Sequence, residues 1–214
     1  MKGTVFTMEE NLDEEFFVEM LNSKKGELAI KQAEKFKEIM CWYGCAIREV
    51  RTKLEVLNDE FQNTTERNPI DNIKARIKKP MSIYEKLIRR GFPVTLDSIL
   101  YNLHDVAGIR VICPFIDDIY TVADMLIAQD DITLIQRKDY IKNPKPNGYR
   151  SLHLVVEVPI FLSTGKQMMK VEVQIRTIAM NFWASLEHQI HYKKSQDDVE
   201  AVSYTHLTLP TIRL

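Results

Sequence analysis

The sequence predicts an α+β fold, in which helices flank a mixed β-sheet and further helices precede it. Three observations support this class: the first third of the chain has helical periodicity, several later segments alternate between apolar and polar residues, and a helical pattern returns after the last of these. The 214 residues, 45% hydrophobic and 28% charged, suffice for one medium-sized domain with its own core. No apolar run approaches the ~18 residues of a membrane span, so we expect no membrane partner.

The chain divides into four parts. Residues 1–26 are an acidic arm, 27–66 form N-terminal helices, 67–202 form the main domain, and 203–214 are an atypical tail that is nearly uncharged and has no helical period. The acidic start differs from the basic and then apolar pattern of a signal peptide, so we expect a cytoplasmic protein. The three cysteines are predicted to be reduced structural thiols.

The elements follow one another clearly along the chain. Residues 27–40 and 46–62 have apolar residues at three- and four-residue spacing, and "NTTERNP" ends this pattern. The later elements are then predicted in this order: a strand at 73–78, helices at 80–90 and 95–103, a strand at 106–113, a helix at 117–129, a strand at 132–141, a hairpin of strands at 151–158 and 169–177, and a helix at 178–194. In the last helix we expect Phe182, Leu186 and Ile190 to form the apolar face.

Positive charge gathers at the start of the main domain. Between Arg67 and Arg90 there are eight basic residues against two acidic ones, in a chain whose net charge is −1. In "IKARIK" Arg76 and Lys78 share one face of the predicted strand, and in the following helix Ser82, Lys86 and Arg89 share one face at i, i+4 and i+7. Such a local excess favours a compact polyanion such as a triphosphate over DNA, although a solvated surface is the ordinary alternative for a charge run.

Two carboxylates and one aromatic ring could complete a nucleotide site. Asp105 stands at the entrance of a buried strand and Glu172 on the polar face of another, and together they could hold a divalent cation. Tyr149, after the turn residues of "KPNGYRSLH", could stack on a base, or it could be an ordinary packed turn residue. The chain has neither a Walker-type phosphate loop nor a kinase glycine-rich loop, so side chains would have to bind the phosphates.

The words "RIKKPMSIYEKLIRR", "HDVAGIRVICPFIDDIY", "KPNGYRSLHLVVEVP" and "VEVQIRTIAMNFWASLEH" occur in order between about residues 68 and 194. In this combination the chain resembles the RelA/SpoT-type alarmone synthetases, in particular the small, stand-alone (p)ppGpp synthetases. The resemblance implies a nucleotidyltransferase-like synthetase domain. It implies that the protein transfers the β,γ-pyrophosphate of ATP to the 3′-hydroxyl of GDP or GTP, with Mg²⁺ as cofactor, in the stringent response.

The resemblance also implies roles for individual residues. Asp105 and Glu172 would be the catalytic and metal-binding pair, with Glu172 a metal ligand or the base near the attacking hydroxyl. ATP would be bound by Arg76, Lys78, Ser82, Lys86, Arg89 and Arg110. GDP or GTP would be bound by Lys145, Asn147, Tyr149, His153, Gln174, Asn181 and Glu187. A homo-oligomer, a tetramer in this family, is implied as well, although residues 203–214 depart from the family pattern.

Two other functions stay open at this point. A toxic relative on the same scaffold would modify adenine nucleotides or the 3′ end of tRNA, and the near-neutral charge argues mildly against so large an anion. A non-catalytic nucleotide- or RNA-binding regulator is the third hypothesis, disfavoured because a binder would need neither Asp105 nor Glu172. His188 and His191 are predicted not to be metal ligands, since they lack a paired carboxylate.

Overall fold

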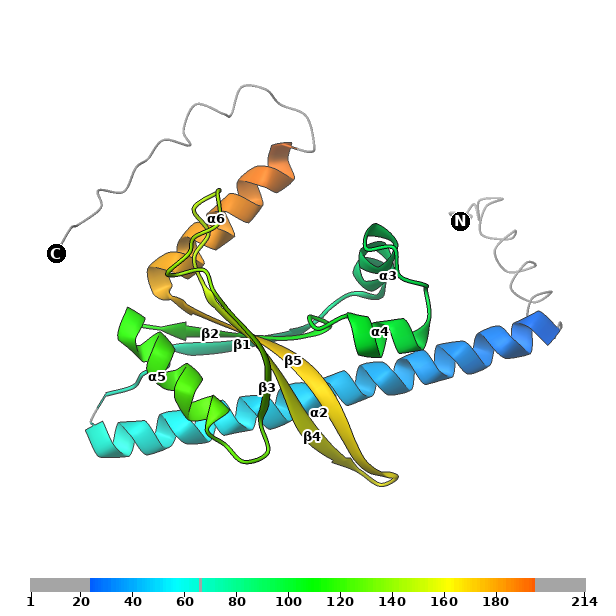
Figure 1. Cartoon of the computed structure of the whole chain (residues 1–214), viewed down its shortest axis with the longest axis horizontal. Coiled ribbons are helices and arrows are strands. Elements are labelled where there is room, and N and C mark those ends of the chain that lie inside the picture. The colour runs from blue at the N-terminus through cyan, green and yellow to red at the C-terminus, as the bar shows by residue number, and fades with distance from the viewer. Residues whose placement is uncertain (1–23, 66, 195–214) are drawn as a thin grey trace, which may run out of the picture.

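The computed structural model describes residues 24–65 and 67–194. Most of the predicted acidic arm, the tail at 203–214 and the side chains of His188 and His191 lie outside this description. A five-stranded sheet packs on one long helix, with shorter helices around its ends (Figure 1). Within the described residues, no helix is both long and apolar enough to cross a membrane.

The long helix α2 spans Lys24–Thr65 without interruption. We expected more than one helix between residues 27 and 66, and this expectation is wrong. The segment has no proline and is rich in good helix formers, so "CWYGC" continues the helix instead of breaking it. One stripe of α2 enters the core, with the buried residues Ile39, Tyr43, Ala46, Ile47, Val50 and Leu54.

The sheet has the strand order β1-β2-β5-β4-β3. Its strands are β1 (Asn72–Ile77), β2 (Ala107–Cys113), β3 (Thr133–Asp139), β4 (Leu152–Leu162) and β5 (Gly165–Thr177). β2 and β5 run parallel, whereas the other three neighbouring pairs are antiparallel, which confirms the predicted mixed sheet. The predicted hairpin is β4–β5. Because β5 also pairs with β2, it lies at the centre of the sheet.

Four helices follow or separate the strands: α3 (Pro80–Arg89), α4 (Leu96–Asn102), α5 (Ile116–Ile127) and α6 (Ile178–Lys194). Gly91 follows the end of α3, and its positive φ of 70° suits the position after a helix C-cap. At the start of α5 the Asp118 carboxylate accepts a hydrogen bond from the Phe115 backbone N–H and pairs with Arg67 at 2.5 Å. This hydrogen bond satisfies a backbone N–H at the start of the helix.

The two faces of the sheet differ in character. Helices α2 and α5 contact one face, where the apolar side chains of the strands form the core. Along β5 the alternation leaves Val171, Val173 and Ile175 fully buried on that side. The polar residues between them therefore lie on the opposite face, where α2 and α5 do not cover them.

The apolar stripe of α6 does not pack against the domain. Phe182 is 66% exposed, and Ile178 and Leu186 are 53% and 45% exposed. We expected Phe182, Leu186 and Ile190 to form the apolar face of this helix; Phe182 and Leu186 lie one turn apart on an exposed face, and the Ile190 side chain lies outside the described residues. The spacing marks an apolar face correctly, but nothing within the described chain covers that face.

Candidate active site

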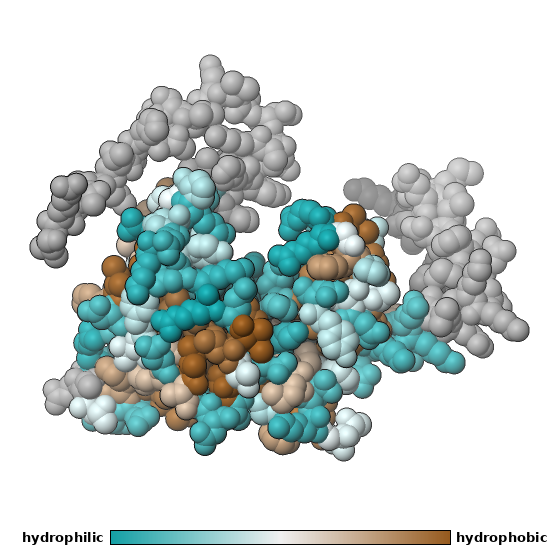
Figure 2. Space-filling model, viewed as in Figure 1, coloured by the Kyte–Doolittle hydropathy of each residue, from teal (hydrophilic) through white to brown (hydrophobic). Residues whose placement is uncertain are grey.

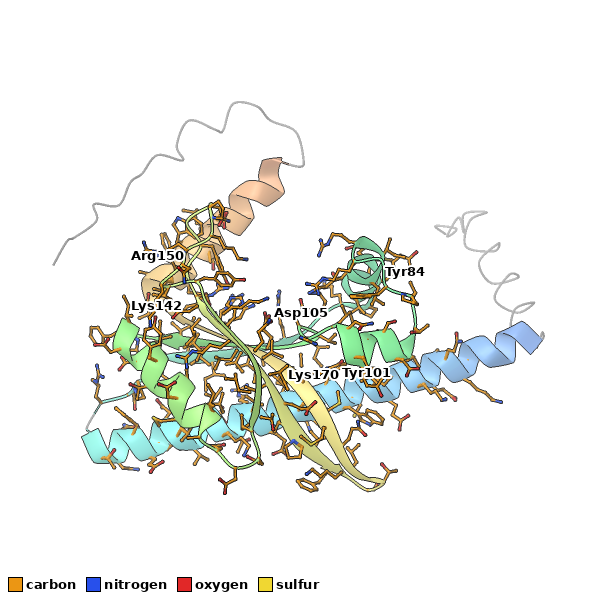
Figure 3. All side chains as sticks on the ribbon, viewed as in Figure 1. Tyr84, Tyr101, Asp105, Lys142, Arg150 and Lys170 are labelled. Carbon is orange, nitrogen blue, oxygen red and sulfur yellow. The ribbon has the colours of Figure 1, made fainter. Side chains whose placement is uncertain are left out.

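The candidate site occupies the polar face of the sheet. Cross-strand register places Arg76 beside Gly108, Gly108 beside Glu172, and His153 beside Gln174. These residues come from four strands, and alternation points their side chains to the same face. Figure 2 shows hydrophilic residues gathered along the hollow between α6 and α3, and Figure 3 places Asp105 between the α3–α4 side and the side that carries Lys142 and Arg150.

A strongly cationic cavity lies between β1 and α3. Its volume is about 530 Å³, and Glu85 is the single acidic residue in its lining. The lining includes the five residues predicted from the two shared faces: Arg76, Lys78, Ser82, Lys86 and Arg89. Guanidinium and ammonium groups arranged around one cavity are suited to bind phosphate oxygens.

Arg110 lines a second, adjoining cavity of about 230 Å³ together with Asp105, Glu172 and Gln174. Arg76 lines both cavities and therefore connects them. The buried Nε of Arg110 has no hydrogen-bond partner among the described residues. Burial and the nearby guanidinium groups of Arg176 and Arg76 lower the pKa of Arg110. The site thus holds unneutralised positive charge that an anionic ligand would offset.

Asp105 is held by two of the predicted phosphate-binding lysines. Its Oδ2 lies 2.7 Å from Lys78 Nζ and 2.5 Å from Lys86 Nζ. Burial opposes ionisation, but the two lysine hydrogen bonds outweigh it and lower the pKa of Asp105. For Lys86, burial outweighs the ion pair, and its pKa is also lowered. The second oxygen, Oδ1, is buried and has no partner among the described residues, so it could accept a further ligand.

Glu172 is held by neighbours on β4 and β5. Its Oε1 lies 3.2 Å from His153 Nδ1, and its Oε2 accepts a 2.9 Å hydrogen bond from Gln174 Nε2. Burial alone would raise the pKa of Glu172, but the hydrogen bonds from His153 and Gln174 lower it overall. Glu172 is therefore a carboxylate in the neutral pH range, as a base or a metal ligand must be.

The residues fit a divalent cation. Asp105 and Glu172 line one cavity. Asp105 Oδ1 has no hydrogen-bond partner among the described residues, because both lysines contact Oδ2 instead. No cluster of three or more His, Cys, Asp or Glu side chains suited to a metal occurs in the described part of the chain. Mg²⁺ commonly binds through one or two carboxylates and completes its shell with water and substrate phosphates, so two acids suffice.

The loop after β3 places further predicted residues beside Glu172. Lys145 and His153 line a third cavity of about 160 Å³ that also includes Glu172. Lys145 Nζ lies 4.8 Å from the ring centroid of Tyr140 and 4.9 Å from that of Tyr149. The loop turns at Gly148, whose φ is 80°.

The Tyr149 ring is half-buried in the structure, and its hydroxyl is engaged. The hydroxyl lies 2.8 Å from His153 Nε2 and accepts a hydrogen bond from Arg176. The ring also packs edge-on against Tyr140, with centroids 6.0 Å apart. Stacking on a guanine base remains a prediction for Tyr149.

Three predicted residues lie where the loop meets α6 and line none of these three cavities. The Asn147 side-chain amide donates a hydrogen bond to Glu187, while its oxygen accepts one from the Tyr149 backbone N–H at 3.3 Å. Asn181 has a buried Oδ1 without a partner in the described chain. Asn147 and Glu187 therefore fasten the loop to α6 in this structure, and nucleotide contacts for all three remain predictions.

Several residues of the site were not predicted. Gln136, Lys138 and Tyr140 line the third cavity, and Lys138 pairs with His153 in the β3–β4 register. These three residues alternate along β3 and into the position after it, a pattern that marks one face of a strand. The sequence did not show which strand would pair with β3. Arg176, on β5, was not among the predicted site residues, and the structure shows that it contacts Tyr149 and Gln174.

Comparison with known proteins identifies the family. A family model described as a region found in RelA / SpoT proteins matches residues 75–197, more than half of the chain. The chain belongs to the RelA/SpoT family.

Two curated relatives in the RelA/SpoT family are similar to this chain over most of its length and of their own. The GTP pyrophosphokinase YwaC of Bacillus subtilis is 44% identical over 77% of this chain and 78% of its own, and YjbM of the same organism is 39% identical over 80% and 79%. Among solved structures, the small alarmone synthetase 1 from Bacillus subtilis bound to its product pppGpp has a TM-score of 0.70 and 38% identity over 78% of this chain and 84% of that one. A GTP pyrophosphokinase family protein from Streptococcus pneumoniae has a TM-score of 0.71 and 37% identity over 78% and 81%.

Proposed function

We propose that this RelA/SpoT-family chain is a GTP/GDP pyrophosphokinase, a (p)ppGpp synthetase that acts in the stringent response. One observation carries the proposal: three cavities in a row share their lining residues. Arg76 joins the cationic cavity to the carboxylate cavity, and Glu172 joins the carboxylate cavity to the loop cavity. A phosphate-binding end, a pair of carboxylates and an aromatic loop thus follow one another along the polar face.

Each cavity supports one part of the reaction. The cationic cavity would bind the triphosphate of ATP, and the loop cavity with Lys145 and His153 would bind GDP or GTP. A solved relative supports the two kinds of ligand, though not their places, since the small alarmone synthetase 1 from Bacillus subtilis has been crystallised with AMPCPP and with pppGpp. The Tyr149 ring would stack on guanine, and Asn147, Asn181 and Glu187 would border the acceptor.

The chain's own side chains would position the reactants and balance charge. A new bond forms between the acceptor 3′-oxygen and the β-phosphorus of ATP, the bond from that phosphorus to the α-phosphate oxygen breaks, and AMP leaves. The Glu172 carboxylate would accept the hydroxyl proton, while the cations around the donor would stabilise the charge on the transferred group. Mg²⁺, which Asp105 and Glu172 would hold, supplies Lewis-acid neutralisation of the phosphate charge.

Two further features support finer parts of the proposal. The exposed apolar stripe of α6, formed by Ile178, Phe182 and Leu186, is the kind of face that another subunit would cover, so we infer a homo-oligomer. The three cysteines are free thiols in the structure, which favours a reducing compartment such as the cytoplasm.

The test is an acceptor screen with the full-length protein, Mg²⁺ and ATP. We expect a 3′-pyrophosphorylated product and AMP with GDP or GTP, and no such product with ATP alone or with tRNA, detected by mass spectrometry. Folded protein that gives no product with either guanine nucleotide would contradict the proposal. Product with ATP or tRNA as the acceptor would support the adenine- or tRNA-modifying alternative instead.

A further inference from the structure

Arg176 is a buried cation that forms no ion pair with a carboxylate of residues 24–65 or 67–194. Its side chain is 4% exposed, and its three hydrogen bonds go to Tyr149, Gln174 and Ser151. All three acceptors are uncharged oxygens. Burying a guanidinium without a directly bonded anion costs stability, so a requirement other than stability must account for an arginine at this position.

The contacts of Arg176 belong to a closed circuit of hydrogen bonds. One arm runs from Arg176 to the Tyr149 hydroxyl, on to His153 Nε2 at 2.8 Å, and from His153 Nδ1 to Glu172 at 3.2 Å. The other arm runs from Arg176 Nη2 to Gln174 Oε1 and from Gln174 Nε2 to Glu172, both at 2.9 Å. Arg176 and Glu172 are therefore the two ends of both arms.

The direction of every bond in the circuit is the one that its two ends require, Arg176 as a pure donor and the Glu172 carboxylate as a pure acceptor. A guanidinium only donates, so the Tyr149 oxygen must accept from it, and the single hydroxyl proton is free to be donated to His153 Nε2. His153 then carries its proton on Nδ1 and donates it to Glu172. In the same way the Gln174 oxygen accepts from Arg176, which turns the amide N–H₂ toward Glu172. Glu172 only accepts, so it requires the same two orientations from its own end, and Arg176 adds fixed places for the Tyr149 and Gln174 oxygens.

We propose that Arg176 is a positioning residue for the transfer reaction: it holds the Tyr149 hydroxyl and the Gln174 amide in place, and through His153 and Gln174 it aims the Glu172 carboxylate at the acceptor. The inference rests on the proposed function, because it assigns Glu172 the acceptor hydroxyl. It also links the acceptor loop to the reaction centre, since the same guanidinium lies 4.9 Å from the Tyr149 ring centroid.

The first experiment compares Arg176→Met, which keeps the apolar stem and removes the donors, with Arg176→Lys, which keeps one charged donor. We expect Arg176→Met to lower kcat by about 10- to 100-fold and to raise the KM for GDP, with the KM for ATP within about 2-fold of wild type. Arg176→Lys should retain more activity than Arg176→Met. Arg51→Met, which removes an exposed arginine paired with Glu55 on α2, is the matched control and should leave the kinetic constants unchanged.

The second experiment measures the tautomer directly by ¹⁵N NMR of the imidazole, with the His153 resonance assigned from a His153→Gln variant. The wild type should show Nδ1–H with a hydrogen-bonded Nε2, and Arg176→Met and Tyr149→Phe should both shift the Nε2 signal toward that of an imidazole nitrogen that receives no hydrogen bond. If Arg176→Met does not fold, Tyr149→Phe still interrupts the same arm while keeping the ring. An unchanged His153 Nε2 signal in the variants, or Arg176→Met with wild-type kcat, would overturn the inference. Wild-type protein that makes no product would instead contradict the proposed function, because the tautomer is measured without turnover.

Discussion

Lys86 Nζ lies 2.5 Å from Asp105 Oδ2, so the carboxylate expected to meet a metal ion is held by a lysine expected to meet phosphate. Lys78 makes a second such contact at 2.7 Å. Both lysines must exchange one anionic partner for another when a nucleotide enters. This arrangement separates the effect of Asp105 on turnover from its effect on nucleotide binding.

The variant Asp105→Asn should separate these two effects. We expect product formation to fall by about 10²- to 10³-fold, because the charged ligand is lost. Binding of metal-free ATP should be at least as tight as in the wild type, since Lys78 and Lys86 no longer have a competing carboxylate. Calorimetric titration with ATP in the presence of a chelator measures the binding. Asp130→Asn, in an exposed turn, is the control, and weaker ATP binding by Asp105→Asn alone would contradict the argument.

Substitutions of Arg89 and Lys138 should affect the KM values of different substrates, because the two residues line different cavities. Arg89 lines the cationic cavity, so Arg89→Gln should raise the KM for ATP by about 10- to 100-fold and change the KM for GDP little. Initial-rate measurements with each substrate varied in turn give both constants. An effect of Arg89→Gln mainly on GDP would reverse the assignment of the cavities.

Lys138 lines the loop cavity and should contribute to acceptor binding. We expect Lys138→Met to raise the KM for GDP by about 10-fold and to leave the KM for ATP unchanged. Arg137→Met provides a matched control, because Arg137 is the neighbouring cation on β3 and pairs with Asp124 of α5 at 3.0 Å. Equal effects of the two substitutions would indicate that β3 contributes only general positive charge.

The pH dependence of stability should include a contribution from Asp139. Burial would raise the pKa of this carboxyl, but hydrogen bonds from the backbone N–H groups of Lys142 and Ile141 and from the Tyr120 hydroxyl lower it overall. A carboxyl whose pKa is lower in the folded state stabilises the fold above its unfolded pKa, and this stabilisation is lost as the pH falls through the folded pKa. Urea unfolding between pH 6 and pH 3, a range set by the usual carboxyl pKa of about 3.9, should show a shallower decline for Asp139→Asn than for wild type. Parallel declines would show that Asp139 does not contribute.

The exposed apolar stripe of α6 should determine the mass of the native assembly, because we infer that a second subunit covers it. Phe182→Glu places a charge on a face that we infer is covered by a second subunit, so it should reduce the assembly to a smaller species in light scattering. Phe161→Glu is the control, because Phe161 is 76% exposed near the tip of the β4–β5 hairpin. If both variants keep the wild-type mass, α6 does not form the interface.

The sequence was informative where the chemistry repeats within one element. The alternation of Arg76 and Lys78 and the helical spacing of Ser82, Lys86 and Arg89 correctly predicted one cationic surface, because both elements are regular and lie next to each other in the chain. Local spacing could not show which strands become neighbours. Lys138 and Arg176 act at the site through contacts with β4 and β5 residues, so only the register of the sheet brought them to notice. Periodicity also could not distinguish an apolar face that packs internally from one that is left open, and α6 is of the second kind.

The row of cavities crosses the sheet from β1 at one edge to β3 at the other, with Glu172 on the central strand β5. Donor and acceptor would then approach from opposite edges, and neither would have to pass the other to reach the centre. We therefore expect random-order kinetics, in which either nucleotide can bind first. An inhibitor that competes with one nucleotide should then leave the rate at which the other binds unaffected.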